Sequence, residues 1–325
     1  MRQDRVILRI EKSIVLFWAL LLLVACGGGA GRSKAEPRQE SEALRPSPRK
    51  SHFQPTLPPV DWEPEAQRAF LREHFWDDFD FADTTFLERV DSAQVIQEYV
   101  LFVAQVLGPE DGEGMRLLMR RAEGSKAMLT YFHQMAERVL HDPNSPFRSD
   151  ELYIPVLEAV VSSPHFDEYE KMAPAYDLEL ARKNRIGEAA QDFRYTRLDG
   201  SSGRLYTLKA PYTLLFFSNP GCPMCRTIQE QITASPRLVS RIEQGTLRVL
   251  MLYPDADLTE WHKHAPEVPT SWINARDPEC VIQAQRLYDL KAIPSLYLLD
   301  SQKRVLLKDV TDVPLIEWRL EQQGL

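Results

Sequence analysis

Residues 212–225, which read YTLLFFSNPGCPMC, decide the fold. The nearly continuous apolar run from Tyr212 to Ser218 is typical of a strand that is buried on both faces of a sheet. A short Asn-Pro-Gly segment follows, and residues 223–234 then have the pattern of an amphipathic helix. The sequence therefore predicts a strand, a turn and a helix, with Cys222 and Cys225 at the start of the helix.

This position gives the two cysteines different expected chemistry. Backbone N–H groups and the helix dipole stabilise negative charge at a helix N-terminus, so we expect Cys222 to react as a thiolate. Pro223 fits the first helical turn without the loss of a hydrogen bond. Cys225 is three residues later and should be more buried. We expect Cys222 to attack a partner disulfide and Cys225 to resolve the mixed disulfide.

Further strands and helices alternate around this segment, which indicates an α/β sheet. Asp199-Gly200 is a candidate turn of a short hairpin that includes Leu205–Leu208. The expected strands are Thr246–Tyr253, Ser295–Leu299 and Arg304–Leu307, and the expected helices are Pro223–Ala234, Pro278–Leu290 and Pro314–Gln322.

An all-α domain is predicted ahead of the sheet, over residues 64–186. Apolar residues recur there at helical spacing, and β-branched runs and glycine turns are few. The expected helices are Ala66–Phe75, Ser92–Leu107, Met115–Arg121, Ser125–Leu140, Ser149–Val161 and Asp167–Asn184.

Two side-chain groups raise the question of a metal site. One interpretation is that the aromatic residues of the segment Phe75–Thr84 dock a helix end, with the Asp residues in solvent or capping the next turn. The alternative is that the Asp residues supply carboxylates to a cation, although their spacing is not that of an EF-hand loop. Cys280 is either a buried, inert thiol at a helix start, a regulatory thiol, or a zinc ligand with Cys222, Cys225 and His262 or His264. Neither spacing matches a known metal site, and we expect neither a metal ion nor a cofactor.

The N-terminus predicts export. Arg2, Arg5, Arg9 and Lys12 precede an apolar run that is shorter than the roughly 20 residues of a membrane-spanning helix. Residues 1–25 therefore have the pattern of a signal peptide. Leu23-Val24-Ala25-Cys26 resembles a bacterial lipobox, which would make Cys26 the lipidated N-terminus of a lipoprotein anchored to the bilayer. The alternatives are an ordinary cleaved signal or an uncleaved anchor.

After Cys26, the chain is rich in Gly, Ser, charged residues and Pro up to about residue 63. This composition predicts a disordered tether over residues 26–63, called the spacer below. A location in the periplasm or cell envelope follows from the export signal, and disulfides persist in that compartment.

Composition excludes other classes of function. Of the 325 residues, 44% are hydrophobic and 26% are charged, which is typical of a globular protein with a real core. The net charge of −8, without a Lys/Arg cluster, argues against nucleic acid as a partner. Four cysteines are too few for a disulfide scaffold and suit a redox motif.

Residues 187–325 resemble the TlpA/ResA-like branch of the thioredoxin fold. The resemblance rests on Cys222-Pro223-Met224-Cys225 and on Ile293-Pro294 ahead of the strand Ser295–Leu299. It implies that Pro294 is cis and packs beside the cysteine pair, and that Ile293, Pro294, Pro223 and Met224 contact the substrate chain. Gly187–Phe193 resembles the first strand of that branch. Residues 64–186 resemble a helical domain of unknown function that precedes such modules in periplasmic lipoproteins.

The sequence departs from thioredoxin at two places. Phe216 stands where thioredoxin carries a buried carboxylate that moves protons. Glu230, on the following helix, is a candidate replacement, although a solvated helix residue is the simpler interpretation. Pro223-Met224 also differs from the thioredoxin pair Gly-Pro, so the reduction potential cannot be carried over.

The expected function is a membrane-anchored thiol:disulfide oxidoreductase. The resemblance implies protein thiols and disulfides of the cell envelope as substrates, net reduction as the direction, and an electron donor in the membrane or periplasm. The alternative is a lipoprotein that binds peptides or envelope proteins, with the cysteine pair as a structural disulfide.

Overall fold

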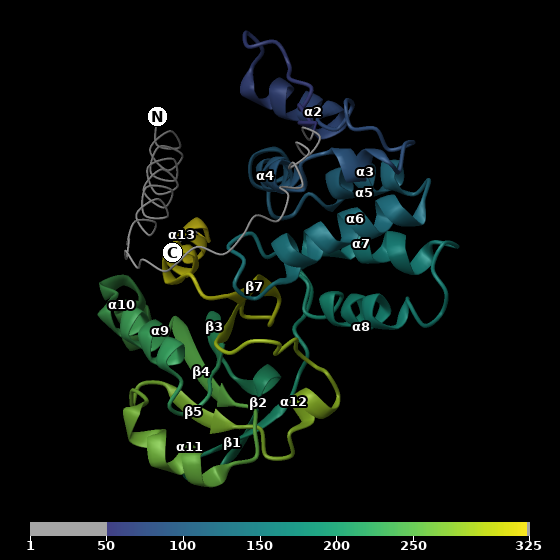
Figure 1. Cartoon of the computed structure of the whole chain (residues 1–325). Coiled ribbons are helices and arrows are strands. Elements are labelled where there is room, and N and C mark those ends of the chain that lie inside the picture. Colours follow the sequence, from purple (N-terminus) through teal and green to yellow (C-terminus); the bar gives the residue numbers. More distant parts are fainter. Residues whose placement is uncertain (1–50, 324–325) are drawn as a thin grey trace, which may run out of the picture. The chain divides into compact units, whose positions relative to one another are not determined.

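The computed structural model describes residues 51–323, which lie within one compact unit (Figure 1). One hydrophobic cluster, from Phe53 to Ala181, forms the core of a helical region, and two others, between Ala190 and Leu320, form the core of a sheet region. The predicted signal peptide, Cys26 and residues 26–50 of the spacer lie outside the described residues. Among residues 51–323, no helix has the length and apolar character needed to cross a membrane.

Helix α7 (Asp150–Ser162) is the centre of the helical region. It packs against α5, α6 and α8, and its side chains are buried over most of its length. The hydroxyl of Ser149 caps it by accepting a hydrogen bond from the backbone N–H of Leu152. The other helices are α2 (Pro64–His74), α3 (Phe86–Arg89), α4 (Ser92–Leu101), α5 (Gly112–Ala122), α6 (Lys126–Ala136) and α8 (Met172–Ala181).

The helical region differs from the prediction in detail. Residues 102–107 and 137–141 continue α4 and α6 as π-helical turns, so the predicted α-helices are shorter than expected. The last predicted helix, Asp167–Asn184, starts only at Met172, where Pro174 fits the first turn, and the chain has left the helix at Asn184, whose φ is 53°.

The aromatic and acidic segment packs into the helical core. Phe75, Trp76 and Phe79 are buried, while the Asp80 carboxylate accepts hydrogen bonds from the backbone N–H groups of Ala82 and Asp83. These contacts confirm the interpretation in which the rings dock and the carboxylates cap turns.

The end of the predicted spacer is part of this core. Phe53 is only 2% exposed, and its ring stacks on Trp76 with 5.0 Å between ring centroids. The Gln94 amide binds both backbone polar groups of Phe53, and Ser51 forms an isolated β-bridge with Val90. The packed part of the chain therefore begins no later than Ser51. The prediction from composition extended the spacer too far, because Phe53 is a single buried ring in an otherwise polar, proline-rich segment.

Replacement of Phe53 by alanine is expected to lower the free energy of unfolding by about 3 kcal/mol, since it removes a buried aromatic side chain from a packed cluster. Chemical denaturation of the purified protein measures this loss. Leu57→Ala is the matched control, because Leu57 is 72% exposed and its removal should change stability by no more than about 0.5 kcal/mol. Equal effects of the two substitutions would contradict the packing of Phe53.

The sheet region contains one seven-stranded mixed sheet in the order β2-β1-β5-β4-β3-β6-β7. Strands β3, β4 and β5 are parallel, whereas β1, β6 and β7 pair antiparallel to their neighbours. The strands are β1 (Arg194–Arg197), β2 (Ser202–Arg204), β3 (Tyr212–Phe217), β4 (Leu247–Tyr253), β5 (Ile273–Arg276), β6 (Ser295–Leu299) and β7 (Val305–Val310). The helices are α9 (Pro223–Ala234), α10 (Pro236–Glu243), α11 (Leu258–His264), α12 (Val281–Ala284) and α13 (Val313–Gln322).

Strand β3 is central because every one of its side chains is buried. Leu214 and Phe216 point into the cluster that α9, α10 and α13 cover, and Leu215 and Phe217 point into the cluster on the opposite face. This two-sided burial explains the continuous apolar run that predicted the strand. Figure 1 shows α9, α10 and α13 grouped on one side of the sheet.

The turn of the predicted hairpin is correct, but its second strand is Ser202–Arg204 and not Leu205–Leu208. Its turn contains Asp199-Gly200, with Gly200 at φ 80°, and it joins β1 to β2. Residues 205–207 form a 3₁₀ turn in which Leu205 is buried. The resemblance also implied a first strand over residues 187–193, and this is wrong: the segment makes one isolated bridge, from Ala189 to Arg304, just before β7.

The predicted helix Pro278–Leu290 is also wrong for most of its length. Only Val281–Ala284 is helical, and Arg286 has a φ of 52°. The carbonyls of Arg286 and Leu287 accept hydrogen bonds from Lys183 and Asn184. These contacts replace the i to i+4 hydrogen bonds that a longer helix would have needed.

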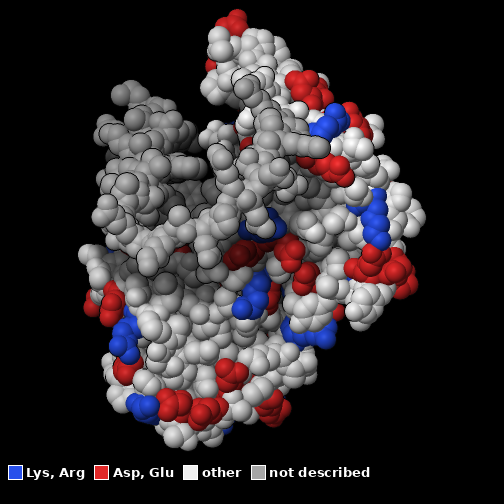
Figure 2. All heavy atoms as spheres, viewed as in Figure 1, with Lys and Arg blue, Asp and Glu red and all other residues white. Residues whose placement is uncertain are grey.

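Ion pairs join the helical region to β7. Lys308 Nζ lies 2.7 Å from Asp150 Oδ2, and Arg148 pairs with Asp309 at 3.1 Å. All four side chains are largely buried, with exposed fractions from 7% to 14%. Elsewhere, on the face that Figure 2 shows, acidic and basic side chains are interspersed.

Candidate active site

Cys222 caps α9 with its sulfur. Its Sγ accepts a hydrogen bond from the backbone N–H of Cys225 at 3.2 Å, and Pro223 occupies the first helical turn. The preceding turn is closed by the N–H of Cys222, which donates to the carbonyl of Asn219 at 3.3 Å, and Gly221 has a φ of 71°. The sulfur therefore lies where helix N–H groups favour negative charge, as predicted from the sequence.

Cys225 differs from Cys222 in burial. Cys225 is 2% exposed, whereas Cys222 is partly exposed, and both are present as free thiols. Burial, followed by the hydrogen bond with Cys222, raises the pKa of Cys225 to about 12. Cys225 is thus held as a protonated thiol at neutral pH, and it must lose a proton before it can act as a nucleophile.

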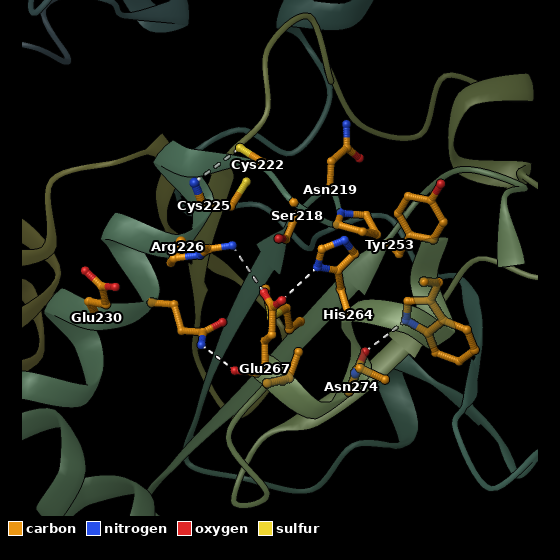
Figure 3. Close-up of a pocket in the computed structure, with 17 residues that line it drawn as sticks. Ser218, Asn219, Cys222, Cys225, Arg226, Glu230, Tyr253, His264, Glu267 and Asn274 are labelled. Carbon is orange, nitrogen blue, oxygen red and sulfur yellow. Dashed lines mark hydrogen bonds and ion pairs between the residues drawn. The ribbon is translucent and has the colours of Figure 1, made fainter. Parts of the chain in front are cut away.

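A pocket of about 360 Å³ opens beside the two cysteines (Figure 3). It lies at the carboxyl ends of β3 and β4 and is completed by the first turns of α9, the end of α11 and β5. Its lining includes Ser218, Asn219, Cys222, Cys225, Arg226, Gln229, Glu230, Met251, Tyr253, Trp261, His264, Glu267, Val268 and Asn274.

His264 and Glu267 form a polar pair on the wall opposite the cysteines. His264 Nδ1 lies 2.9 Å from Glu267 Oε1, and Glu267 Oε2 lies 3.5 Å from Arg226. Figure 3 shows Glu267 between Arg226 and His264, joined to both by dashed lines. Gln229 Nε2 donates to the Glu267 carbonyl at 2.6 Å, which connects this wall to α9.

The predicted substrate contacts lie at the same end of the sheet region. The Ile293–Pro294 peptide bond is cis, as the resemblance implied, and Ile293 packs against the hydrophobic cluster that contains Cys225. Pro294 is buried, and neither residue lines the pocket. Pro223 and Met224 are exposed beside Cys222, with Met224 at 56%. Their role in substrate binding remains a prediction.

The position that departs from thioredoxin contains no ionisable group. Phe216 is fully buried and contacts Trp272. Glu230 is exposed and lines the pocket, and in Figure 3 it is set apart from the cysteines.

Cys280 is partly exposed, so the interpretation of Cys280 as a buried, inert thiol is wrong. It precedes a helix of one turn, at a φ of 50°, where the longer predicted helix does not form. It does not line the pocket with Cys222 and Cys225. Within residues 51–323, no group of three or more His, Cys, Asp or Glu side chains is arranged to hold a metal ion.

The pairing of His264 with Glu267 was missed from the sequence. His262 and His264 are both on α11, and the sequence-based prediction named them only as alternative zinc ligands. The three-residue spacing from His264 to Glu267, at the end of a helix, is the one sequence feature that indicates this pairing. It does not indicate whether His262 or His264 faces the cysteines.

Comparisons with known proteins place this geometry in context. The family model described as a domain of unknown function, DUF5106, matches residues 29–184. The chain is 40% identical to a thioredoxin-like protein from Bacteroides caccae whose crystal structure is known. The match covers 85% of this chain and 99% of that chain, with a TM-score of 0.79. This similarity confirms the predicted fold class, a thioredoxin-like sheet after an all-α region.

Two shorter structures from Bacteroides fragilis also match. The C-terminal domain of an uncharacterised protein is 46% identical, with 42% of this chain and 98% of that chain covered and a TM-score of 0.41. A conserved protein of unknown function is 41% identical, with 41% of this chain and 98% of that chain covered and a TM-score of 0.40. No curated protein matches the chain.

Proposed function

The chain belongs to the family of thioredoxin-like proteins, and on this premise we propose that it is a thiol:disulfide oxidoreductase that acts on protein disulfides through Cys222 and Cys225. The observation that carries the proposal is the cap of α9. Cys222 is partly exposed and its sulfur accepts a helix N–H, while Cys225 is buried three residues later. A nucleophile needs the first environment, and a resolving thiol that waits for a mixed disulfide needs the second.

In the proposed reaction, the Cys222 thiolate attacks one sulfur of a substrate disulfide. A mixed disulfide forms, and the first substrate thiolate leaves and takes up a proton. Cys225 then loses its proton and attacks Cys222 Sγ, which releases the second substrate thiolate. The protein ends with a Cys222–Cys225 disulfide, and the substrate disulfide has gained two electrons and two protons.

The surface beside Cys222 suits a protein substrate. Met224 and Pro223 are exposed next to the reactive sulfur, and an exposed thioether adapts to varied partners. We assign Ile293 and Pro294 to the wall against which the substrate main chain lies. The pair then needs an electron donor to return it to the dithiol form.

We further propose that the protein works in the bacterial cell envelope as a lipoprotein. The support is the sequence alone: a basic N-terminus, a short apolar run and the lipobox-like Leu23–Cys26. Acylation of Cys26 would anchor the protein to a bilayer, and the residues after it would hold the packed body away from the lipid.

Cys225→Ser is expected to trap substrates. It leaves Cys222 able to attack but removes the resolving thiol, so mixed disulfides should accumulate in cells and migrate as larger species on non-reducing gels. Mass spectrometry of the trapped species identifies the partners and the linked cysteine. A Cys222→Ser, Cys225→Ser double variant is the control and should trap nothing. If Cys225→Ser traps no protein, the proposal of a protein substrate is wrong.

A further inference from the structure

Cys225 needs a proton acceptor for the resolving step. Its thiol is buried, and Phe216, which belongs to the same hydrophobic cluster, cannot accept a proton. The pocket brings ionisable side chains to the cysteine pair. Apart from the cysteines, the ionisable residues in its lining are Arg226, Glu230, Tyr253, His264 and Glu267.

Four of these five side chains are unsuited to the task. Arg226 is permanently charged and has no lone pair to offer. Burial raises the pKa of Tyr253 above its ordinary value, so its phenol stays protonated at neutral pH. Glu230 is exposed and is set apart from the cysteines in Figure 3. Each carboxylate oxygen of Glu267 already has a partner, His264 on one side and Arg226 on the other.

His264 has the geometry of a base. It is the last residue of α11, and its side chain is 20% exposed. Nδ1 lies 2.9 Å from Glu267 Oε1, whereas Nε2 lies 3.4 Å from Glu260 Oε2. The shorter contact favours the tautomer in which Nδ1–H donates to Glu267 and the lone pair of the neutral ring is on Nε2. Nε2 lies against the turn that carries Cys222: a Cβ added at Gly221 would be 3.5 Å from it.

We propose that His264, oriented by Glu267, accepts the proton of Cys225 through water in the pocket when Cys225 resolves the mixed disulfide. This inference rests on the proposed thiol:disulfide exchange and deepens it. The S–H bond of Cys225 breaks and an N–H bond forms on Nε2. The Cys225 thiolate then attacks Cys222 Sγ, the mixed disulfide breaks, and the departing substrate thiolate takes the proton from the imidazolium.

Charged groups around His264 favour this cycle. Glu260 Oε2 lies 3.4 Å from Nε2 and Glu267 Oε1 lies 2.9 Å from Nδ1, so both N–H groups of the imidazolium face a carboxylate. Lys263 pairs with Glu260 at 3.1 Å, and Arg226 pairs with Glu267, which keeps the two carboxylates in place. From the sheet, Tyr253 of β4 and Asn274 of β5 face the same pocket and are uncharged at neutral pH. A pocket of this volume has room for several bridging water molecules.

The two chemical steps can be measured separately with Ellman's reagent, an aromatic disulfide. Attack by Cys222 releases the first thionitrobenzoate, and attack by Cys225 on the resulting mixed disulfide releases the second. Both are coloured, and stopped-flow absorbance gives one rate for each. A Cys26→Ser, Cys280→Ser background of the full chain restricts the signal to the pair.

His264→Gln is expected to slow the second release about 100-fold at neutral pH, because a positioned base contributes on this order. The first release should keep its rate. The deficit should shrink as pH rises, since hydroxide then removes the Cys225 proton directly. Glu267→Gln should slow the second release by a smaller factor, because the ring loses the partner that fixes its tautomer. His262→Gln is the matched control: His262 is exposed on the same helix, does not line the pocket, and should change neither rate.

The outcomes separate this inference from the proposed function. Unchanged second release in both His264→Gln and Glu267→Gln would overturn the inference and leave thiol exchange intact. Equal slowing of both releases, or equal slowing by His262→Gln, would also overturn it, because it would indicate a general structural effect. Absence of a rapid first release in the parent protein would contradict the proposed function, and this inference would fall with it.

Discussion

Replacement of Cys222 by serine is expected to reduce the catalysed reduction of a protein disulfide, such as insulin with dithiothreitol, to the rate seen without protein. A serine hydroxyl stays protonated at neutral pH and does not attack a disulfide, whereas Cys222 is partly exposed and its sulfur accepts a helix N–H. The turbidity of precipitating insulin chains measures the rate.

Cys280→Ser is the control for this experiment. Cys280 is also partly exposed and precedes a helix, but that helix has only four residues and Cys280 does not line the pocket. Its replacement should leave the rate unchanged. Retention of more than about a tenth of the activity by Cys222→Ser would assign the chemistry to another thiol, since the thiolate is the nucleophile in exchange.

The second large effect is expected at the ion pair between Lys308 and Asp150. Besides Asp150, Lys308 Nζ donates to the carbonyls of Ala181 at 2.9 Å and Lys183 at 2.6 Å. Lys308→Ala would leave a buried carboxylate and two carbonyls without their donor, and it should lower the free energy of unfolding by about 3–5 kcal/mol. Urea denaturation measures the loss.

An exposed ion pair provides the control. Arg120 lies 3.2 Å from Glu113, and the two side chains are 48% and 51% exposed. Water solvates both charges when the pair is broken, so Arg120→Ala should cost less than about 1 kcal/mol. Similar losses for Lys308→Ala and Arg120→Ala would contradict a buried ionic connection between the helical region and β7.

The loss from Lys308→Ala should also depend on pH. Burial alone would raise the pKa of Asp150, but Lys308, together with Lys291 and His141, outweighs burial and holds that pKa below its usual range. A carboxyl with a lowered folded-state pKa contributes stability that is complete above its unfolded-state pKa of about 3.9 and is lost as pH falls through the folded value. The difference between parent and variant should therefore be largest near neutral pH and smaller at about pH 3.

The elements that could be predicted are those with strong one-sided or two-sided burial. Strands β3 and β6 are buried on both faces, so their apolar runs are continuous. Helix α6 has a regular apolar face and a Ser125 cap, and its start was predicted to within a residue. Two of the elements that were missed bury little: α11 buries only Trp261 of its seven residues, and β5 is a four-residue strand with one fully buried side chain.

The cysteines and His264 also differ in how well the sequence predicts their place in the candidate site. Cys222 and Cys225 are adjacent to the strongest strand in the sequence, and local structure alone places them at a helix start. His264 reaches the pocket only because β4 and β5 are paired and α11 connects them. No local pattern distinguishes His264 from His262, and only tertiary structure shows which of them faces the cysteines.

The central claim is that Cys222 and Cys225 cycle between dithiol and disulfide, and an equilibrium redox titration tests it most directly. The protein, with Cys26 and Cys280 replaced by serine, is equilibrated in thiol–disulfide buffers, and alkylation with mass spectrometry gives the fraction oxidised. A thiolate stabilised at a helix N-terminus favours the reduced form, so we predict reversible oxidation with a potential above about −300 mV. A potential below about −300 mV would mark a structural disulfide and contradict the account.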